Sequence, residues 1–243
     1  MAALYDIHGN APALAAVLDE VRALEVDGVV VGGDVFPGPM GPRCLELLTG
    51  LAAPVYWLRG NGDRDTLEAF RGGPIARVPN AFKETIQWCA NDAGSAVEAI
   101  DLWPPTVSLD VAEFGEVLFC HAAPGDDNTL FLEHTPETRI ANLFEGVHAS
   151  LVVCGHTHMQ FDRTVEALRV VNAGSVGMPF GPPGAYWAIL SSTGIELRRT
   201  TYDYEAAART FAATEYPLPM NPALPPTAES MISAFESSIG DHE

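Results

Sequence analysis

The feature that most constrains this chain is a series of short apolar runs, each of which ends in glycine or in polar side chains. Helical patterns separate the first three of these runs. The predicted strands are residues 2–5, 28–32 and 54–58, and the predicted helices between them are residues 11–24 and 42–51. A strand-helix-strand-helix-strand order gives a parallel sheet whose functional loops emerge at the carboxyl ends of its strands.

The second half of the chain has a different pattern, with short strands separated by turn residues. The predicted elements are a hairpin of residues 106–111 and 116–120, a helix at 136–146, an antiparallel series of strands at 150–154, 159–165, 168–172, 186–191 and 195–201, and a closing helix at 203–214. We therefore expect two sheets, one from each half of the chain. The predicted fold is α/β, a four-layer α/β/β/α sandwich of two mixed sheets flanked by helices.

A single domain is expected to cover residues 1–243, because one α/β core routinely fills a chain of this length. Residues 80–102 have a helical pattern that Gly94 interrupts, and we interpret them as a helical insert. Residues 216–243 form a Pro-rich C-terminal tail that ends in a further helical pattern at 228–238. The sequence leaves open whether this tail packs on the domain or extends from it.

The net charge indicates which binding partners are disfavoured, and the cysteines indicate the cellular compartment. The 13 Lys and Arg against 32 Asp and Glu give a net charge of −19, which disfavours long nucleic acid and anionic membrane as partners. Four scattered cysteines without a Cys-x-x-Cys pair are expected to be reduced core thiols, which favours a cytoplasmic location. No signal peptide or membrane span is expected. A phosphate-bearing substrate would need local cations, and bound metals are their obvious source.

Side chains that bind metals stand where five of the predicted strands end. Each block has a plainer interpretation when taken alone, such as a chance loop pair or an Asn-Gly turn. Taken together, they supply three carboxylate or amide oxygens and four imidazoles from successive strand ends. The candidate ligands are Asp6, His8, Asp34, Asn61, His121, His156 and His158.

This set of ligands is large enough for two divalent cations. Oxygen and imidazole ligands suit Mn, Fe, Zn or Co better than Ca or a metal that prefers thiolates. Two such ions about 3.5 to 4 Å apart would clamp a phosphoryl group, and a bridging water with a lowered pKa would attack it in line. The pattern therefore indicates a phosphoryl-transfer or phosphate-ester chemistry.

The order of the blocks resembles that of the calcineurin-like metallophosphoesterase superfamily, from residue 2 to about residue 180. The chain is most similar to its small single-domain phosphodiesterases of bacteria and archaea, whose Asn-x-Gly-Ser-Val-Gly-x-Pro loop matches residues 172–179. The resemblance implies the four-layer sandwich and a loop at 172–179 that lines the site. It also implies two metal positions, one held by Asp6, His8, Asp34 and His158 and the other by Asp34, Asn61, His121 and His156, with Asp34 bridging them.

Gly62 departs from the pattern of the superfamily, in which many members have a histidine between the Asn and the Asp. That imidazole would contact the phosphate or protonate the leaving group, which is typically worth about 10²- to 10⁴-fold in rate. Related phosphodiesterases also lack it. We hypothesise that Arg64 supplies a compensating positive charge and that Asp63 has lost the task of orienting that histidine. The candidate catalytic residues are then Asp34, Asn61 and Arg64.

These observations predict a dinuclear metal-dependent phosphoesterase with a metal-bridging hydroxide as nucleophile and Mn as the favoured metal. A phosphodiesterase acting on a small phosphate ester is favoured by the branch resemblance and by Gly62. Two alternatives stay open. One is a non-catalytic scaffold or binding protein on the same fold, like the trafficking subunit of the superfamily, whose metal ligands are degraded. The other is a nucleotide anhydride hydrolase. The sequence indicates no oligomeric state.

Overall fold

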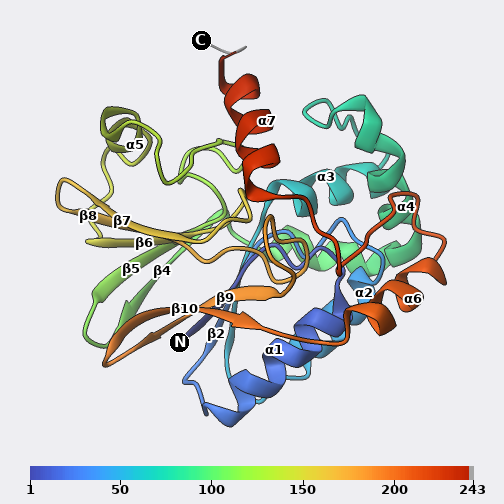
Figure 1. The fold of residues 1–243 in the computed structure, drawn as a ribbon, viewed down its shortest axis with the longest axis horizontal. Helices are drawn as coiled ribbons and strands as arrows, with labels where there is room; N and C mark the ends of the chain where they lie inside the picture. Colours follow the sequence, from blue (N-terminus) through green and yellow to red (C-terminus); the bar gives the residue numbers. More distant parts are fainter. Residues whose placement is uncertain (241–243) are drawn as a thin grey trace.

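The computed structural model describes residues 1–240 and contains two five-stranded mixed sheets (Figure 1). The first sheet has the order β10-β9-β1-β2-β3 and the second has the order β4-β5-β6-β8-β7. The strands of the first sheet are β1 (Ala2–Leu4), β2 (Val29–Gly32), β3 (Val55–Leu58), β9 (Ala185–Ser191) and β10 (Gly194–Thr200). Those of the second are β4 (Thr106–Val111), β5 (Gly115–Cys120), β6 (Leu151–Cys154), β7 (Phe161–Val165) and β8 (Leu168–Asn172).

The first three strands form the predicted parallel unit. β1 and β2 pair in parallel with Ala2 opposite Val29, and β2 pairs in the same sense with β3. Every residue of β1 and β2 is buried. A strand that is covered on both faces needs a continuous apolar run, which is what β2 has.

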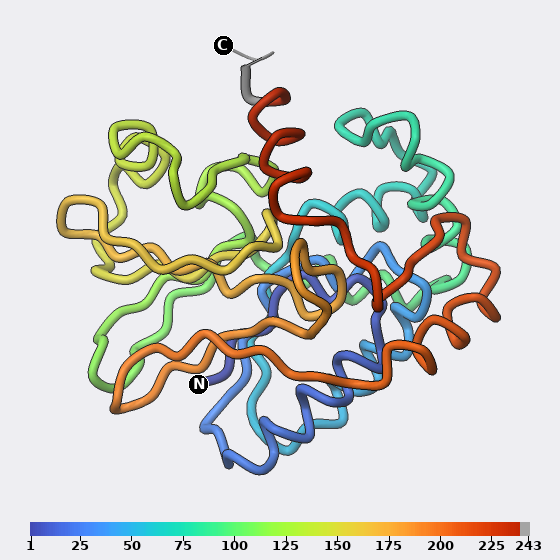
Figure 2. Tube along the Cα trace, viewed as in Figure 1, coloured from blue at the N-terminus to red at the C-terminus, as the bar shows by residue number. Residues whose placement is uncertain are grey.

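The predicted pairing of the later strands is wrong in two respects. β9 and β10 join the first sheet, where β9 runs antiparallel to β1 with Ala2 opposite Ile189. Figure 2 shows this late segment beside the N-terminal strands. In addition, β5, β6 and β8 are parallel neighbours, and only the β4–β5 and β7–β8 pairs of the second sheet are antiparallel. The apolar patterns placed the strands, whereas their partners depend on contacts far apart in sequence.

The helices form the outer layers. α1 (Ala11–Ala23), α2 (Gly41–Thr49) and α4 (Lys83–Ala93) contribute to an apolar core on the outer face of the first sheet. A second core, which includes Tyr5 and Phe119, lies between the sheets. α5 (Glu137–Leu143) covers the outer face of the second sheet. The four predicted layers are therefore confirmed. The remaining helices are α3 (Asn61–Phe70), α6 (Tyr204–Ala212) and α7 (Ala228–Gly240).

The segment interpreted as an insert completes this helical layer. It consists of η1 (Asn80–Phe82), α4 and the 3₁₀ segment η2 (Gly94–Leu102). α4 ends at Ala93 and is followed by Gly94, whose φ of 51° is easily adopted only by glycine. Cys89, Val97 and Ile100 are buried in the same core as α1 and α2. The insert thus covers the first sheet. The division of residues 1–243 into one domain stays a prediction.

All four cysteines are free and buried. Within residues 1–240, no helix has both the length and the apolar character that crossing a bilayer requires.

Candidate metal centre

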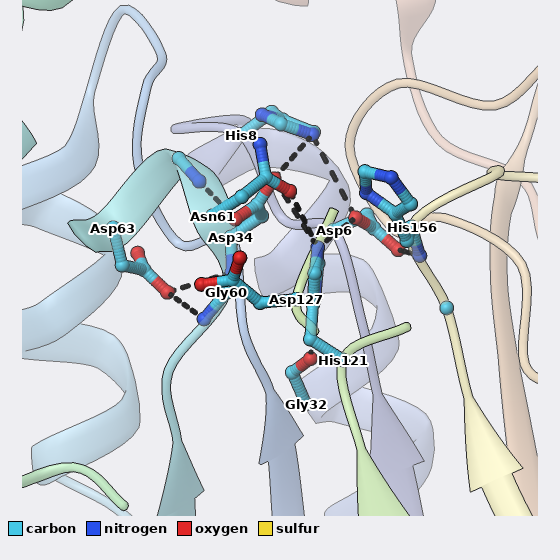
Figure 3. Close-up of polar contacts among 12 residues, drawn as sticks. Asp6, His8, Gly32, Asp34, Gly60, Asn61, Asp63, His121, Asp127 and His156 are labelled. Atoms are coloured by element: carbon cyan, nitrogen blue, oxygen red, sulfur yellow. Dashed lines mark hydrogen bonds and ion pairs between the residues drawn. The ribbon is translucent and has the colours of Figure 1, made fainter. Parts of the chain in front are cut away.

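The seven predicted ligands all follow strands whose carboxyl ends lie at one edge of the two facing sheets (Figure 3). Asp6 and His8 follow β1, Asp34 follows β2, Asn61 follows β3, His121 follows β5, and His156 and His158 follow β6. The cluster thus draws on both sheets, so that assembling the sandwich also assembles the site.

The side chains meet within hydrogen-bonding or near-contact distance. Asp6 Oδ1 lies 3.3 Å from His158 Nε2 and 3.8 Å from His121 Nε2. Asp34 Oδ2 lies 3.6 Å from His121 Nε2 and 3.8 Å from His8 Nε2. The structure therefore brings both carboxylates and three imidazoles to one point.

The two remaining candidates join the cluster from its rim. Asn61 Oδ1 lies 3.0 Å from His121 Nε2. The rings of His156 and His121 have centroids 5.1 Å apart, and the His156 backbone N–H donates to Asp6 Oδ2 at 2.8 Å. Every predicted ligand therefore lies in the cluster.

The backbone at five of these residues is in the left-handed region. The φ values of Asp6, His8, Asp34, His156 and His158 lie between 44° and 66°. Such conformations cost about 1–3 kcal/mol each for a residue with a side chain, and they persist only where the surroundings enforce them. Strained backbone of this kind concentrates at functional sites.

Three imidazoles are oriented by backbone carbonyls. The Nδ1 atoms of His8, His121 and His158 lie 3.0, 2.9 and 2.6 Å from the carbonyl oxygens of Pro37, Gly32 and Met178 respectively. A carbonyl oxygen only accepts hydrogen bonds, so each Nδ1 carries the proton and each Nε2 presents a lone pair. This is how proteins orient histidines that bind metals through Nε2.

The Nε2 lone pairs of these histidines lie close together, with no hydrogen-bond donor between them. His8 Nε2 and His158 Nε2 are 3.1 Å apart, and both atoms are acceptors in the tautomers just assigned. Asp6 Oδ1 and His156 Nε2 are buried and have no hydrogen-bond partner among the described residues. Buried acceptors without a donor are costly. A cation removes this cost, so the donor set fits divalent metal ions.

Two overlapping groups have the spacing needed to hold an ion. One consists of Asp6, His8 and His158, and the other of Asp6, Asp34 and His121, with the ligand atoms of each group within 4.8 Å of one another. All five residues are buried. The carboxylate common to both groups is Asp6, whereas the resemblance implies that Asp34 bridges the two metal positions, so the assignment of ligands to individual ions stays a prediction.

Burial sets the protonation of the cluster. It lowers the pKa of His8 and of His156 to about 3, so that both imidazoles are neutral and can bind a metal near neutral pH. Burial raises the pKa of Asp34 well above its usual value, and the charges of Asp63 and Asp6 add to this effect. For Asp6, burial acts in the same direction but is outweighed by His158 and His121, and the net pKa is lowered.

Asp63 holds the loop of Asp34 in place. Its Oδ2 accepts hydrogen bonds from the backbone N–H groups of Asp34 at 2.7 Å and Gly60 at 3.1 Å, and its Oδ1 accepts one from Phe36 at 2.9 Å. Burial raises the pKa of Asp63 to about 6, although these three hydrogen bonds oppose the shift. Sequence reasoning missed this positioning role, since no spacing rule connects residue 63 with residues 34 and 36.

Gly62 is required by its neighbours. Its N–H donates to Asp34 Oδ1 at 2.7 Å, and a Cβ at this position would lie 2.5 Å from the carbonyl oxygen of Phe36 and 2.6 Å from Pro37 Cδ. Side chains are therefore excluded at position 62 unless the loop at 36–37 moves. The packing around position 62 therefore requires glycine.

The loop at residues 172–179 contacts the site as expected. Ser175 Oγ and the Gly177 N–H both donate to the Asp6 carbonyl, at 2.7 and 3.0 Å, and Met178 provides the carbonyl that orients His158. Asn172 Nδ2 donates to the Gly155 carbonyl at 2.7 Å. The loop therefore fixes the two segments that carry Asp6 and His158.

Arg64 lies on α3 and lines a cavity of about 230 Å³ together with His121, Arg77 and Asp127. Its guanidinium pairs with Asp127 and, at 3.1 Å, with Asp65. The predicted positive charge is thus next to the cluster, and carboxylates hold it there. Its contact with a phosphate stays a prediction.

Two facing mixed sheets with carboxylates and imidazoles gathered at one edge define the class of metal-binding α/β/β/α sandwiches. The family model of the calcineurin-like phosphoesterase superfamily domain matches residues 1–194, and the chain belongs to this superfamily. The predicted family is therefore confirmed. A search of the curated proteins finds no match.

Solved structures agree on the fold. The hypothetical protein PH1004 from Pyrococcus horikoshii OT3 superposes with a TM-score of 0.77 at 18% identity, over 89% of this chain and 94% of that one. A metallophosphoesterase from Sphaerobacter thermophilus superposes with a TM-score of 0.70 at 20% identity, over 97% of this chain and 98% of that one. At these identities the similarity establishes the fold.

Proposed function

We propose that this protein is a two-metal phosphodiesterase that hydrolyses a small phosphate ester. The observation that carries the proposal is the convergence of buried acceptor atoms with no donor among them, namely the Nε2 atoms of His8, His121 and His158 around Asp6 Oδ1. Membership of the phosphoesterase superfamily supports an ester of phosphoric acid as the substrate.

In this proposal Asp6, His8, Asp34 and His158 hold one cation, and Asp34, Asn61, His121 and His156 hold the other, with Mn favoured over Fe, Zn and Co. Bound cations would supply an activated water and would offset the charge on the phosphoryl oxygens. The chain itself positions the ligands through Asp63, Ser175 and the carbonyls that orient the imidazoles.

The preference for a diester rests on the resemblance to the phosphodiesterase branch and on Gly62. Position 62 provides no imidazole to protonate a leaving group, so esters with good leaving groups are favoured. A net charge of −19 favours a compact substrate over long nucleic acid. Arg64 lines the cavity beside His121, and in this proposal its guanidinium attracts a phosphate oxygen.

The test is hydrolysis of matched aryl phosphodiester and monoester substrates by protein that is stripped of metal and reloaded with Mn²⁺. We expect diester turnover that depends on Mn²⁺ and disappears in Asp34→Asn. The matched control is Asp162→Asn, since Asp162 pairs with Arg169 at the exposed end of β7. Activity of this control shows that losing one ion-paired aspartate does not by itself inactivate the protein.

The other outcomes separate the alternatives. A preference for the monoester would contradict the argument from Gly62 and leave a phosphoesterase. Faster hydrolysis of dinucleoside polyphosphates than of diesters would favour the nucleotide anhydride hydrolase. Absence of turnover on all three substrates with Mn²⁺, Fe²⁺, Zn²⁺ and Co²⁺ would contradict the proposal and favour a non-catalytic scaffold.

A further inference from the structure

The C-terminal helix α7 rises from the side of the molecule at which the strands deliver the candidate metal ligands (Figure 1). The tail that leads to it is attached at two points before the helix begins. The Tyr216 ring packs edge-on against Trp88 of α4 with centroids 5.3 Å apart, and the Pro226 carbonyl accepts a hydrogen bond from the Gly181 N–H at 2.9 Å. The tail therefore crosses from the helical layer of the first sheet to the segment that joins β8 to β9.

α7 then contacts a chain of aromatic rings that ends at a candidate ligand. The Phe235 ring lies 6.0 Å from the Phe180 ring, which stacks on the His158 imidazole with centroids 4.7 Å apart and planes 20° apart. The next residue, Glu236, accepts a hydrogen bond from His134 Nε2 through its Oε1 atom, at 2.8 Å. Both members of this ion pair are more than half exposed. Such an exposed pair contributes little to stability. The contact between Phe235 and Phe180 therefore contributes more to holding α7 in place than the pair does.

The sheet topology shows where this places α7. The strands β5, β6 and β8 are parallel neighbours in that order, so the segments that follow them leave the same edge side by side. His134 lies in the segment after β5, and Phe180 in the segment after β8. A helix that contacts both therefore spans the segment between them, which carries His156 and His158.

The apolar face of α7 is incompletely covered. Met231, Ile232 and Phe235 recur at helical spacing on one face, and all three are half-buried, as is Phe180. Among residues 228–238 no side chain of α7 is fully buried. The chain has 32 acidic residues, yet it leaves the Phe235 and Phe180 rings partly exposed next to the candidate ligand His158. Binding of a charged phosphate alone does not explain such an aromatic surface.

We propose that Phe235 and Phe180 form an apolar wall that binds an aromatic or other apolar group esterified to the substrate phosphate. This inference rests on the proposed function, of which it specifies the substrate class. Phe235 acts as a residue that determines specificity and takes no part in metal binding. Because apolar contact area stabilises a complex roughly in proportion to its size, an aromatic ester group gains affinity there and a methyl group does not.

The test uses binding, so that it does not depend on turnover. Phenylphosphonate and methylphosphonate share their charged group and differ only in the apolar group. We measure the affinity of the Mn²⁺-loaded full chain for each by titration calorimetry. In the unaltered protein phenylphosphonate binds more tightly, and Phe235→Ala reduces the ratio of the two affinities about tenfold, which corresponds to roughly 1.4 kcal/mol. Affinity for methylphosphonate and for Mn²⁺ stays unchanged.

Two further variants complete the experiment. Ser233→Ala changes an exposed side chain of the same helix and keeps the full ratio. A chain that ends at Pro226 lacks α7, retains the hydrogen bond to Gly181, and loses the preference to at least the same extent as Phe235→Ala.

An affinity ratio that is unchanged in Phe235→Ala and in the shortened chain would overturn the inference, as would a ratio that rises, since α7 would then exclude bulky groups. Failure of both phosphonates to bind would also overturn it. The proposed function is judged separately, by hydrolysis of methyl and phenyl 4-nitrophenyl phosphate, which share a leaving group. If neither diester is hydrolysed while phenylphosphonate still binds through Phe235, the proposed function fails and the apolar wall stands.

Discussion

Asp63 connects two loops that are far apart in sequence, because its carboxylate accepts three buried N–H groups from Asp34, Phe36 and Gly60. A buried N–H group that loses its acceptor costs about 1–3 kcal/mol. We expect Asp63→Ala to reduce the free energy of unfolding by at least about 2 kcal/mol and to weaken Mn²⁺ binding. Urea denaturation and Mn²⁺ titration measure the two effects.

The matched control for this prediction is Asp19→Ala. Asp19 pairs with Arg22 at the surface, and its side chain is 80% exposed. Stability and Mn²⁺ affinity should stay nearly unchanged in this variant. Equal losses in both variants would show that Asp63 has no special task at the site.

Gly62 limits what can be engineered at this site. We expect Gly62→Ala to cost about 1–3 kcal/mol, since its Cβ would overlap the backbone of Phe36. It should also weaken Mn²⁺ binding by displacing the hydrogen bond to Asp34. Gly125→Ala is the control, because a Cβ there meets no atom within 4 Å. Thermal denaturation of the two variants measures the difference, and equal melting temperatures would contradict the packing argument.

Arg64 tests the hypothesis of a compensating charge. If its guanidinium contacts the substrate phosphate, Arg64→Ala should lower kcat/KM for the aryl diester about tenfold, the usual size of one charge-assisted hydrogen bond. Arg71→Ala is the matched control, because Arg71 makes an exposed ion pair with Asp101. Steady-state kinetics on both variants distinguish the roles, and a rate unaffected by Arg64→Ala would refute the hypothesis.

At the scale of whole elements, the sequence predicted where strands occur better than how they pair. The run at β2 is apolar because helices and the second sheet cover its two faces, so its pattern is local and visible. The side of β1 on which β9 lies is determined by contacts between residues 2 and 189. No local pattern encodes such a pairing.

The helix α3 was not predicted, for a related reason. Its first residues, Asn61 and Gly62, favour a turn in a single sequence. In the structure, the Asp63 carboxylate caps the start of the helix by accepting a hydrogen bond from the Gly60 N–H. Its other hydrogen bonds come from the backbone N–H groups of Asp34 and Phe36. The seven candidate ligands could be found because they follow apolar runs. Among the residues that position them, the loop at 172–179 was indicated by the family resemblance, whereas the role of Asp63 was not.

The two sheets are linked by a hydrogen bond between Tyr5, directly after β1, and β6. Tyr5 Oη donates to the Val153 carbonyl at 2.8 Å in the buried layer between the sheets. We expect Tyr5→Phe to destabilise the fold by about 0.5–1.5 kcal/mol. In the control Tyr186→Phe, the lost hydroxyl bonds an exposed carbonyl of Pro182, and stability should change little. Urea denaturation of both variants provides the comparison, and equal effects would contradict the linking role.

Glycines make room for this link. A Cβ on Gly32 would lie 2.0 Å from the Tyr5 ring, and a Cβ on Gly155 would lie 2.6 Å from it. Both glycines directly follow or end a strand that delivers candidate ligands. Gly32 and Gly155 therefore leave space for the Tyr5 ring and also lie where the chain turns toward the candidate site.

At the scale of the whole molecule, metal binding should be coupled to stability. The clustered acceptors are buried only in the folded chain, so a cation binds the folded state in preference to the unfolded one. At a free Mn²⁺ concentration of about 100 times Kd this adds roughly 2.7 kcal/mol. For a chain of this size we expect the melting temperature to rise by about 5–10 °C.

Differential scanning calorimetry of chelator-treated protein with and without added Mn²⁺ measures this shift. His121→Ala removes an imidazole that contacts both carboxylates and Asn61, and it should abolish the shift. His148→Ala alters a histidine in the segment before β6, outside the candidate ligands, and should preserve it. A shift of the same size in all three proteins would mean that Mn²⁺ acts elsewhere.

The pairing of β1 with β9 has a consequence for the order in which the chain is made. β1 is synthesised before β9, the strand that covers its open side, which follows about 180 residues later. At 5–20 residues per second, this leaves an interval of roughly 10 to 40 seconds. During that time the nascent chain has an uncovered apolar strand edge, which is a template for aggregation. Chaperones that bind nascent chains should therefore associate with this protein until β9 has been synthesised.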